Sequence, residues 1–184
     1  MSNRYITSHF PLISIVLFSL AFALFVQGFL IEQLMSFGLY EGMREFFSEN
    51  GIKLTLLFLL LLLFFMVFSA LKLIADTTLQ LSLLFFSNDE EGKDLIKVRT
   101  GSWVFFISGM LSLFLVTEWR WLLLLFLVAC LIYFVYFIYQ VSDSMSFFGM
   151  FGMVFFHVIF WTGFLLLTLY AAVKLYNSFI ASLP

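Results

Sequence analysis

The sequence predicts an all-α, polytopic transmembrane helical bundle. Hydrophobic residues make up 64% of the 184-residue chain and charged residues only 11%, against roughly half and a quarter in soluble domains. Residues 54–71 contain no charge, glycine or proline. At ~1.5 Å per residue, a helix of that length covers most of a ~30 Å hydrocarbon layer. Other long apolar segments follow, separated by short polar stretches, so lipid is the expected solvent for most of the chain.

We expect a single membrane domain of residues 1–184 with five spans. Four spans is the alternative, if the short third span is re-entrant or only interfacial. The second span can continue as a helix to residue 86. Such a helix would be ~50 Å long and would exceed the hydrocarbon layer. Its far end would then project from the membrane or bend along the membrane surface, or the whole helix would tilt. The predicted spans are 12–31, 54–71, 101–116, 121–139 and 147–170.

Two segments outside the spans have their own patterns. Residues 34–49 are typical of a short amphipathic helix at the membrane surface, with apolar and acidic side chains on separate faces. Asn50 and Gly51 are expected to end that helix. Residues 87–100 are the strongly hydrophilic loop of the chain, with acids such as Asp89 and Glu90 first and bases last.

A few polar residues in or beside the spans form a candidate polar path. Lys72 and Asp76 are four residues apart and therefore share a helical face, with Gln80 one turn further on. His157 lies in the middle of the last predicted span. Ionisable groups inside a membrane often mark a route for ions or substrates. The competing interpretation places Lys72 and Asp76 at the headgroups, and makes His157 a hydrogen-bonded packing residue.

Small residues in the third and last spans are candidates for close helix packing, because they allow helix backbones to approach each other in lipid. These candidates are Ser108, Gly109, Ser112, Gly149, Gly152 and Gly163.

The sequence favours a protein that is not an enzyme. It has no H-E-x-x-H metal motif, no glycine-rich phosphate loop and no G-x-S-x-G elbow, and a single cysteine, Cys130. We therefore expect no catalytic residues, no metal site and no cofactor. A net charge of −2 argues against nucleic-acid binding. The expected partners are membrane lipids and, through helix association, another copy of the chain or another membrane protein. The alternative function is a small transporter or channel that uses the polar path.

Orientation is expected from the Lys and Arg residues of the loops, which favour the cytoplasmic side. With the N-terminus inside, four of these residues lie on each side, and Lys72 adds a fifth to the inside if its side chain reaches that surface. We therefore expect a cytoplasmic N-terminus. The inner residues are Arg4, Lys93, Lys97 and Arg99, and the outer ones are Arg44, Lys53, Arg120 and Lys174.

One stretch of the chain resembles a known family. Residues 39–87, which begin LYEGMREFFSENGIK, together with Tyr5, Ile6 and Thr7 and with residues 9–13, look like the small YufK-like membrane protein family of Bacillus-type bacteria. The resemblance extends over the whole chain in length and in the order of spans. It implies a location in the bacterial plasma membrane, and it implies no activity and no functional residues.

Overall fold

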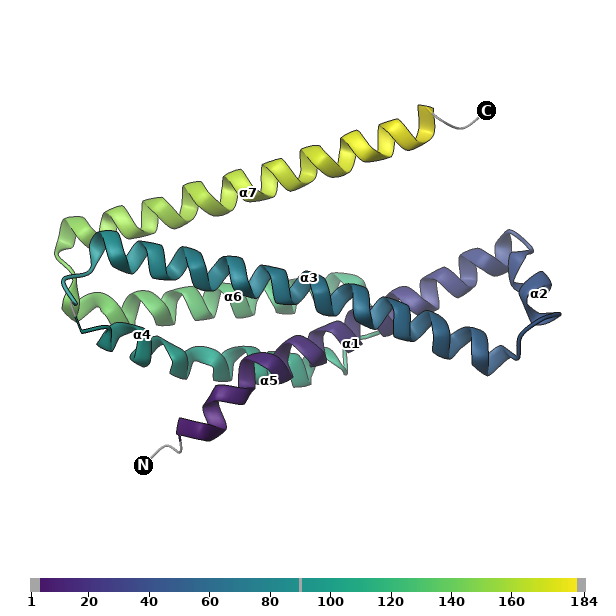
Figure 1. Cartoon of the computed structure of the whole chain (residues 1–184), viewed down its shortest axis with the longest axis horizontal. Coiled ribbons are helices and arrows are strands. Elements are labelled where there is room, and N and C mark those ends of the chain that lie inside the picture. The colour runs from purple at the N-terminus through teal and green to yellow at the C-terminus, as the bar shows by residue number, and fades with distance from the viewer. Residues whose placement is uncertain (1–3, 90, 182–184) are drawn as a thin grey trace.

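The computed structural model describes residues 4–89 and 91–181, so Glu90 of the predicted hydrophilic loop lies outside the described residues. Every regular element in these two ranges is a helix, and the long helices lie side by side (Figure 1). The all-α, bundled class predicted from the sequence is confirmed.

Four of the described helices are long and apolar enough to cross a membrane. Each contains a predicted span; α1, α3 and α6 extend beyond it at both ends, and α7 extends beyond it at its C-terminal end. The second helix continues to Phe86, as the longer of the two alternatives predicted, since no glycine or proline follows residue 71 to stop it. The four helices are α1 (Arg4–Ser36), α3 (Glu49–Phe86), α6 (Trp119–Val141) and α7 (Phe147–Ala181).

The third predicted span, 101–116, is shorter than expected. Helix α5 (Ser102–Ser112) has 11 residues. It is preceded without a gap by α4 (Lys93–Val98) and the 3-10 helix η1 (Arg99–Gly101), so half of the predicted loop 87–100 is helical. Residues 93–112 therefore form one continuous helical path of about 30 Å at 1.5 Å per residue.

The prediction of a single surface helix over residues 34–49 is wrong. Helix α1 continues to Ser36, and Gly38 then adopts φ +71°, a left-handed conformation that ends the helical path. Only the short α2 (Leu39–Arg44) follows. Asn50 and Gly51 do not end a helix either. They lie in the first turn of α3, where the Ser48 hydroxyl accepts the Gly51 N–H at 3.1 Å as an N-cap.

The helices are arranged as two hairpins and one diverging helix. Helices α1 and α3 form a hairpin joined by α2, and this hairpin extends past the turn between α5 and α6 (Figure 1). Helix α1 packs mainly on α3 and α5. Helix α7 lies against α3 near its own start and then moves away from the bundle (Figure 1).

Helices α3 and α6 run parallel and in a fixed register. The rings of Phe68 and Phe126 are 5.2 Å apart, and about five turns further on the Asn88 N–H donates to the Ser144 carbonyl at 3.0 Å. By residue count from these two contacts, Asp76 lies at about the level of Tyr133. At the far end of these helices lies the main cluster of buried apolar side chains: Leu79, Leu83, Val98, Phe137, Val141 and Met153.

The small residues of α5 face α1. Ser108, Gly109 and Ser112 are all buried. A Cβ at Gly109 would lie 3.2 Å from the Cβ of Leu17, which is a tight contact. A larger side chain there would hold the two helices further apart.

The small residues of α7 divide into two groups. A Cβ at Gly149 would lie 2.9 Å from the Phe86 carbonyl oxygen, and one at Gly152 would lie 2.7 Å from the Phe86 ring. These two glycines therefore allow α7 to approach the end of α3. Gly163, by contrast, has nothing within 4 Å of a Cβ built on it. It takes no part in packing inside this chain.

Replacing Gly149 by alanine is expected to destabilise the protein, whereas Gly163→Ala is not. Both changes remove a glycine from α7, and alanine favours a helix by up to ~1 kcal/mol. Only at Gly149 does the new Cβ meet backbone that cannot rotate away, at a cost of about 1–3 kcal/mol. Thermal unfolding in detergent should give a lower Tm for Gly149→Ala and an unchanged or higher Tm for Gly163→Ala. Equal Tm values for the two variants would contradict this packing.

Candidate functional site

Three residues of the predicted polar path lie on one side of α3. Lys72 donates a hydrogen bond to Asp76 and forms an ion pair with it. The side chains of Lys72 and Asp76 are 33% and 45% exposed, and Gln80 is exposed one turn further along. The pair is therefore open on one side.

The register with α6 gives the depth of this pair. Tyr133, which is level with Asp76, lies about 12 Å from Val141 and about 21 Å from Trp119 along α6 at 1.5 Å per residue. The same count along α3 places Asp76 about 16 Å from Ser87. The ion pair thus lies well inside the length of α6, and not level with either end of that helix.

His157 of α7 is buried between α6 and α7. Its side chain is 6% exposed, and its Nδ1–H donates to the Met153 carbonyl at 3.0 Å. Its ring centroid is 5.3 Å from Phe134 and 5.7 Å from both Phe137 and Phe156. The histidine is hydrogen-bonded to its own helix and enclosed by aromatic rings.

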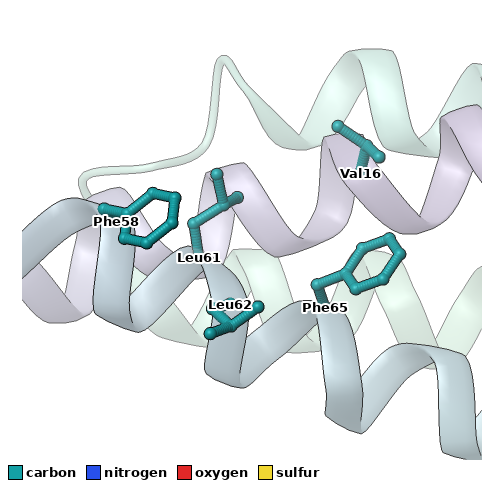
Figure 2. Close-up of a pocket in the computed structure, with 5 residues that line it drawn as sticks. All are labelled: Val16, Phe58, Leu61, Leu62 and Phe65. Carbon is teal, nitrogen blue, oxygen red and sulfur yellow. The ribbon is translucent and has the colours of Figure 1, made fainter.

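Two surface hollows lie away from the predicted polar path. The first is an open depression of about 330 Å³ on α2, lined by Glu41, Arg44 and Glu45. The second is a groove of about 160 Å³ between α1 and α3 (Figure 2), whose lining is entirely apolar: Val16, Phe58, Leu61, Leu62 and Phe65.

The principal polar cluster was missed by the sequence analysis. It is centred on Asp94, which is 2% exposed. The carboxylate accepts hydrogen bonds from the hydroxyls of Ser87, at 2.9 Å, and Ser144, and from the Lys97 ammonium, at 3.3 Å. These donors come from the end of α3, from α4 and from the turn after α6. We call Asp94, Ser87, Ser144 and Lys97 the Asp94 cluster.

Asp89 extends this cluster through the backbone. Its carboxylate accepts the N–H of Asp94 at 2.7 Å and the N–H of Glu91 at 3.1 Å. These backbone hydrogen bonds, chiefly the one from Asp94, hold the pKa of Asp89 below its ordinary value. The ionised carboxylate of Asp89 therefore stabilises the start of α4. This stabilisation is fully present above the ordinary pKa of a carboxyl group, and it is lost as the pH falls through the lowered pKa of Asp89.

A weak signal in the sequence could have pointed to Asp94. It follows Gly92 by two residues and lies in the first turn of α4, where a carboxylate is favoured, although the sequence analysis expected a loop there. Its burial depends on Ser144, which is fifty residues away in the chain, and no local pattern shows that contact. Within the described residues, no three His, Cys, Asp or Glu side chains converge to hold a metal.

Four long apolar helices, with the buried Asp94 cluster beside the end of α6, define an integral, multi-pass membrane protein. Residues 27–184 match the model of a family described as "Family of unknown function (DUF5366)". The chain is also 44% identical over 184 residues to the "Uncharacterized membrane protein YufK" of Bacillus subtilis (strain 168), a match that covers 100% of both chains. The chain therefore belongs to this YufK-like family, which confirms the resemblance seen in the sequence. No solved structure matches it.

Removing the Asp94 carboxylate is expected to destabilise the fold. Asp94→Ala leaves two partly buried hydroxyls and one ammonium without their shared acceptor, at a cost of about 1–3 kcal/mol. Asp143→Ala is the matched control, because Asp143 is an exposed acid in the same polar region. Chemical unfolding in detergent should show a loss of stability for Asp94→Ala and a change within about 0.5 kcal/mol for Asp143→Ala. An unchanged stability of Asp94→Ala would contradict the role of the cluster.

Proposed function

We propose that the protein acts by helix association and not by catalysis, either as a homo-oligomer or as an accessory subunit of another membrane complex. The observation that supports this best is the free half of α7. Residues 165–178 are exposed on every side, and this part of α7 points away from the other helices (Figure 1). A long apolar helix that leaves its own bundle is available to a neighbouring protein in the membrane.

The chemistry of α7 suits such a contact. Helices associate in lipid mainly through close packing and polar contacts at small residues, because lipid tails are as apolar as the side chains. Gly163 has open space around it, and Thr162 beside it is exposed. Gly149 and Gly152 already pack inside the chain, so Gly163 is the one of the three predicted packing glycines of α7 that is open to a partner.

We also propose five membrane crossings, with the N-terminus in the cytoplasm of the bacterial cell. The ends of α3 and α6 are joined by the Asn88–Ser144 hydrogen bond, whereas α6 begins about 34 Å away at its other end. The chain must return over that distance between α3 and α6. The continuous helical path of residues 93–112 supports this return as the third crossing, although α5 alone is too short for one.

The alternative function, a small transporter or channel, is favoured by the depth of the Lys72–Asp76 pair. An ion pair inside a hydrocarbon layer is a functional candidate by default. If this alternative holds, the protein in proteoliposomes conducts an ion or solute, and Asp76→Asn abolishes that flux while the protein stays folded. A flux equal to that of empty liposomes for the unmutated protein would remove this alternative.

The association proposal is tested by native mass spectrometry after gentle extraction from native membranes. We expect a homo-oligomer or a stoichiometric complex with a second membrane protein. Gly163→Leu should weaken that assembly, because it fills the open space on α7 without touching the rest of the chain. Leu166→Ala, also on the exposed half of α7, is a control that adds no bulk. A monomer without any protein partner would contradict the proposal.

A further inference from the structure

The Lys72–Asp76 pair is in an unusual position for an exposed ion pair. Four ion pairs are found among the described residues. One lies at the start of α3, one belongs to the Asp94 cluster and one lies beside that cluster, near the ends of the long helices. Only the fourth pair, on α3, lies level with the middle part of α6. The pairs are Glu49–Lys53, Glu91–Lys93, Asp94–Lys97 and Lys72–Asp76.

Charged side chains are costly in a hydrocarbon layer, and those that occur there almost always face protein or water. The two charges of this pair neutralise each other, but a third of the Lys72 side chain and nearly half of the Asp76 side chain remain uncovered by this chain. Along α3, Asp76 lies about 16 Å and Lys72 about 22 Å from Ser87, too far for either to be placed among the headgroups with that end of the helix. A polar surface from outside the chain must cover them.

The pair continues the face of α3 that is buried further along the helix. Residues seven apart lie on nearly the same face of a helix, so Lys72 is in line with Leu79, and Asp76 with Leu83. Leu79 and Leu83 are buried in one cluster with Met153 of α7. Near the Asp94 cluster, α7 therefore covers this face of α3. At Lys72 and Asp76 the same face is open, since these side chains are 33% and 45% exposed.

We infer that a second copy of this chain covers the open face of α3, with Lys72 of each copy against Asp76 of the partner subunit. The inference rests on the proposed function and names the homo-oligomer as its form. The dimer has a two-fold axis along the membrane normal, and the diverging α7 of each copy leaves room for the other copy.

Charge and depth select a second copy over other occupants. A two-fold axis along the membrane normal places the pairs of both copies at the same depth, and residue i of each copy can contact residue j of the other. Each pair carries both signs one helical turn apart, so two copies can exchange partners and form a four-membered charge network. An unlike protein would need its own charges of both signs at this depth. The phosphate of a lipid lies at the membrane surface, away from the pair.

Charge reversal tests this interface. Lys72→Asp makes the position all acidic, and Asp76→Lys makes it all basic. Each variant alone should lose the dimer, because like charges then meet across the interface. The two variants, produced together with different affinity tags, should form a mixed dimer. The double variant K72D/D76K keeps both signs and should dimerise with itself. Native mass spectrometry and differential-tag purification from nanodiscs measure these outcomes.

The pair Glu49–Lys53 provides the matched control. It has the same spacing on the same helix, it is also exposed, and it lies outside the length of α6. Glu49→Lys and Lys53→Glu should leave the dimer unchanged. Circular dichroism of every variant checks that a lost dimer is not a lost fold, and recovery in the mixed sample shows that each single variant folds.

The outcomes separate this inference from the proposed function. A wild-type dimer that is indifferent to all the charge variants overturns this interface and leaves association in place. A wild-type monomer bound to a different membrane protein overturns the inference and supports an accessory subunit. A wild-type monomer with no partner overturns both. Loss in each single variant with recovery in the mixture and in the double variant supports the interface.

Discussion

The buried carboxylate of Asp94 is the constraint on which the arrangement of this protein depends. A charge that is 2% exposed is stable only with partners, and here its partners come from three separate segments. The cluster therefore joins the end of α3 and the start of α4 to the turn after α6. Together with the Asn88–Ser144 backbone hydrogen bond, it sets the register between two parallel helices.

The other features of the fold follow from that register. The ends of α3 and α6 lie side by side at the Asp94 cluster, so Lys72 and Asp76 of α3 lie level with the middle part of α6. For the same reason the α1–α3 hairpin extends beyond the turn between α5 and α6 (Figure 1). Helix α7 is held at its start, where Gly149 and Gly152 admit Phe86. Its later part has no such contact, and residues 165–178 are exposed.

The sequence predicts the long helices well, because hydropathy over about twenty residues is a strong signal and lipid removes most alternatives to a helix. The sequence prediction fails where a single residue determines whether a helix begins or ends. The left-handed Gly38 divides the helix expected over 34–49, and the Ser48 cap turns an expected stop at Asn50 and Gly51 into a start. Lys72 and Asp76 were recognised as a pair from their spacing. Their depth, like the burial of Asp94, depends on tertiary contacts that no local pattern contains.

The depth of the Lys72–Asp76 pair is the central claim, and spin labels measure it directly. In a Cys130→Ala background, a label at Leu73→Cys would lie on an exposed side chain of α3 beside the pair, and one at Asp143→Cys would report the polar end. Collision rates with oxygen and with a water-soluble nickel chelate give the depth of each label in a bilayer. The account predicts oxygen-dominated collisions at Leu73→Cys and nickel-dominated collisions at Asp143→Cys. Nickel-dominated collisions at both positions would place the pair at the headgroups and contradict it.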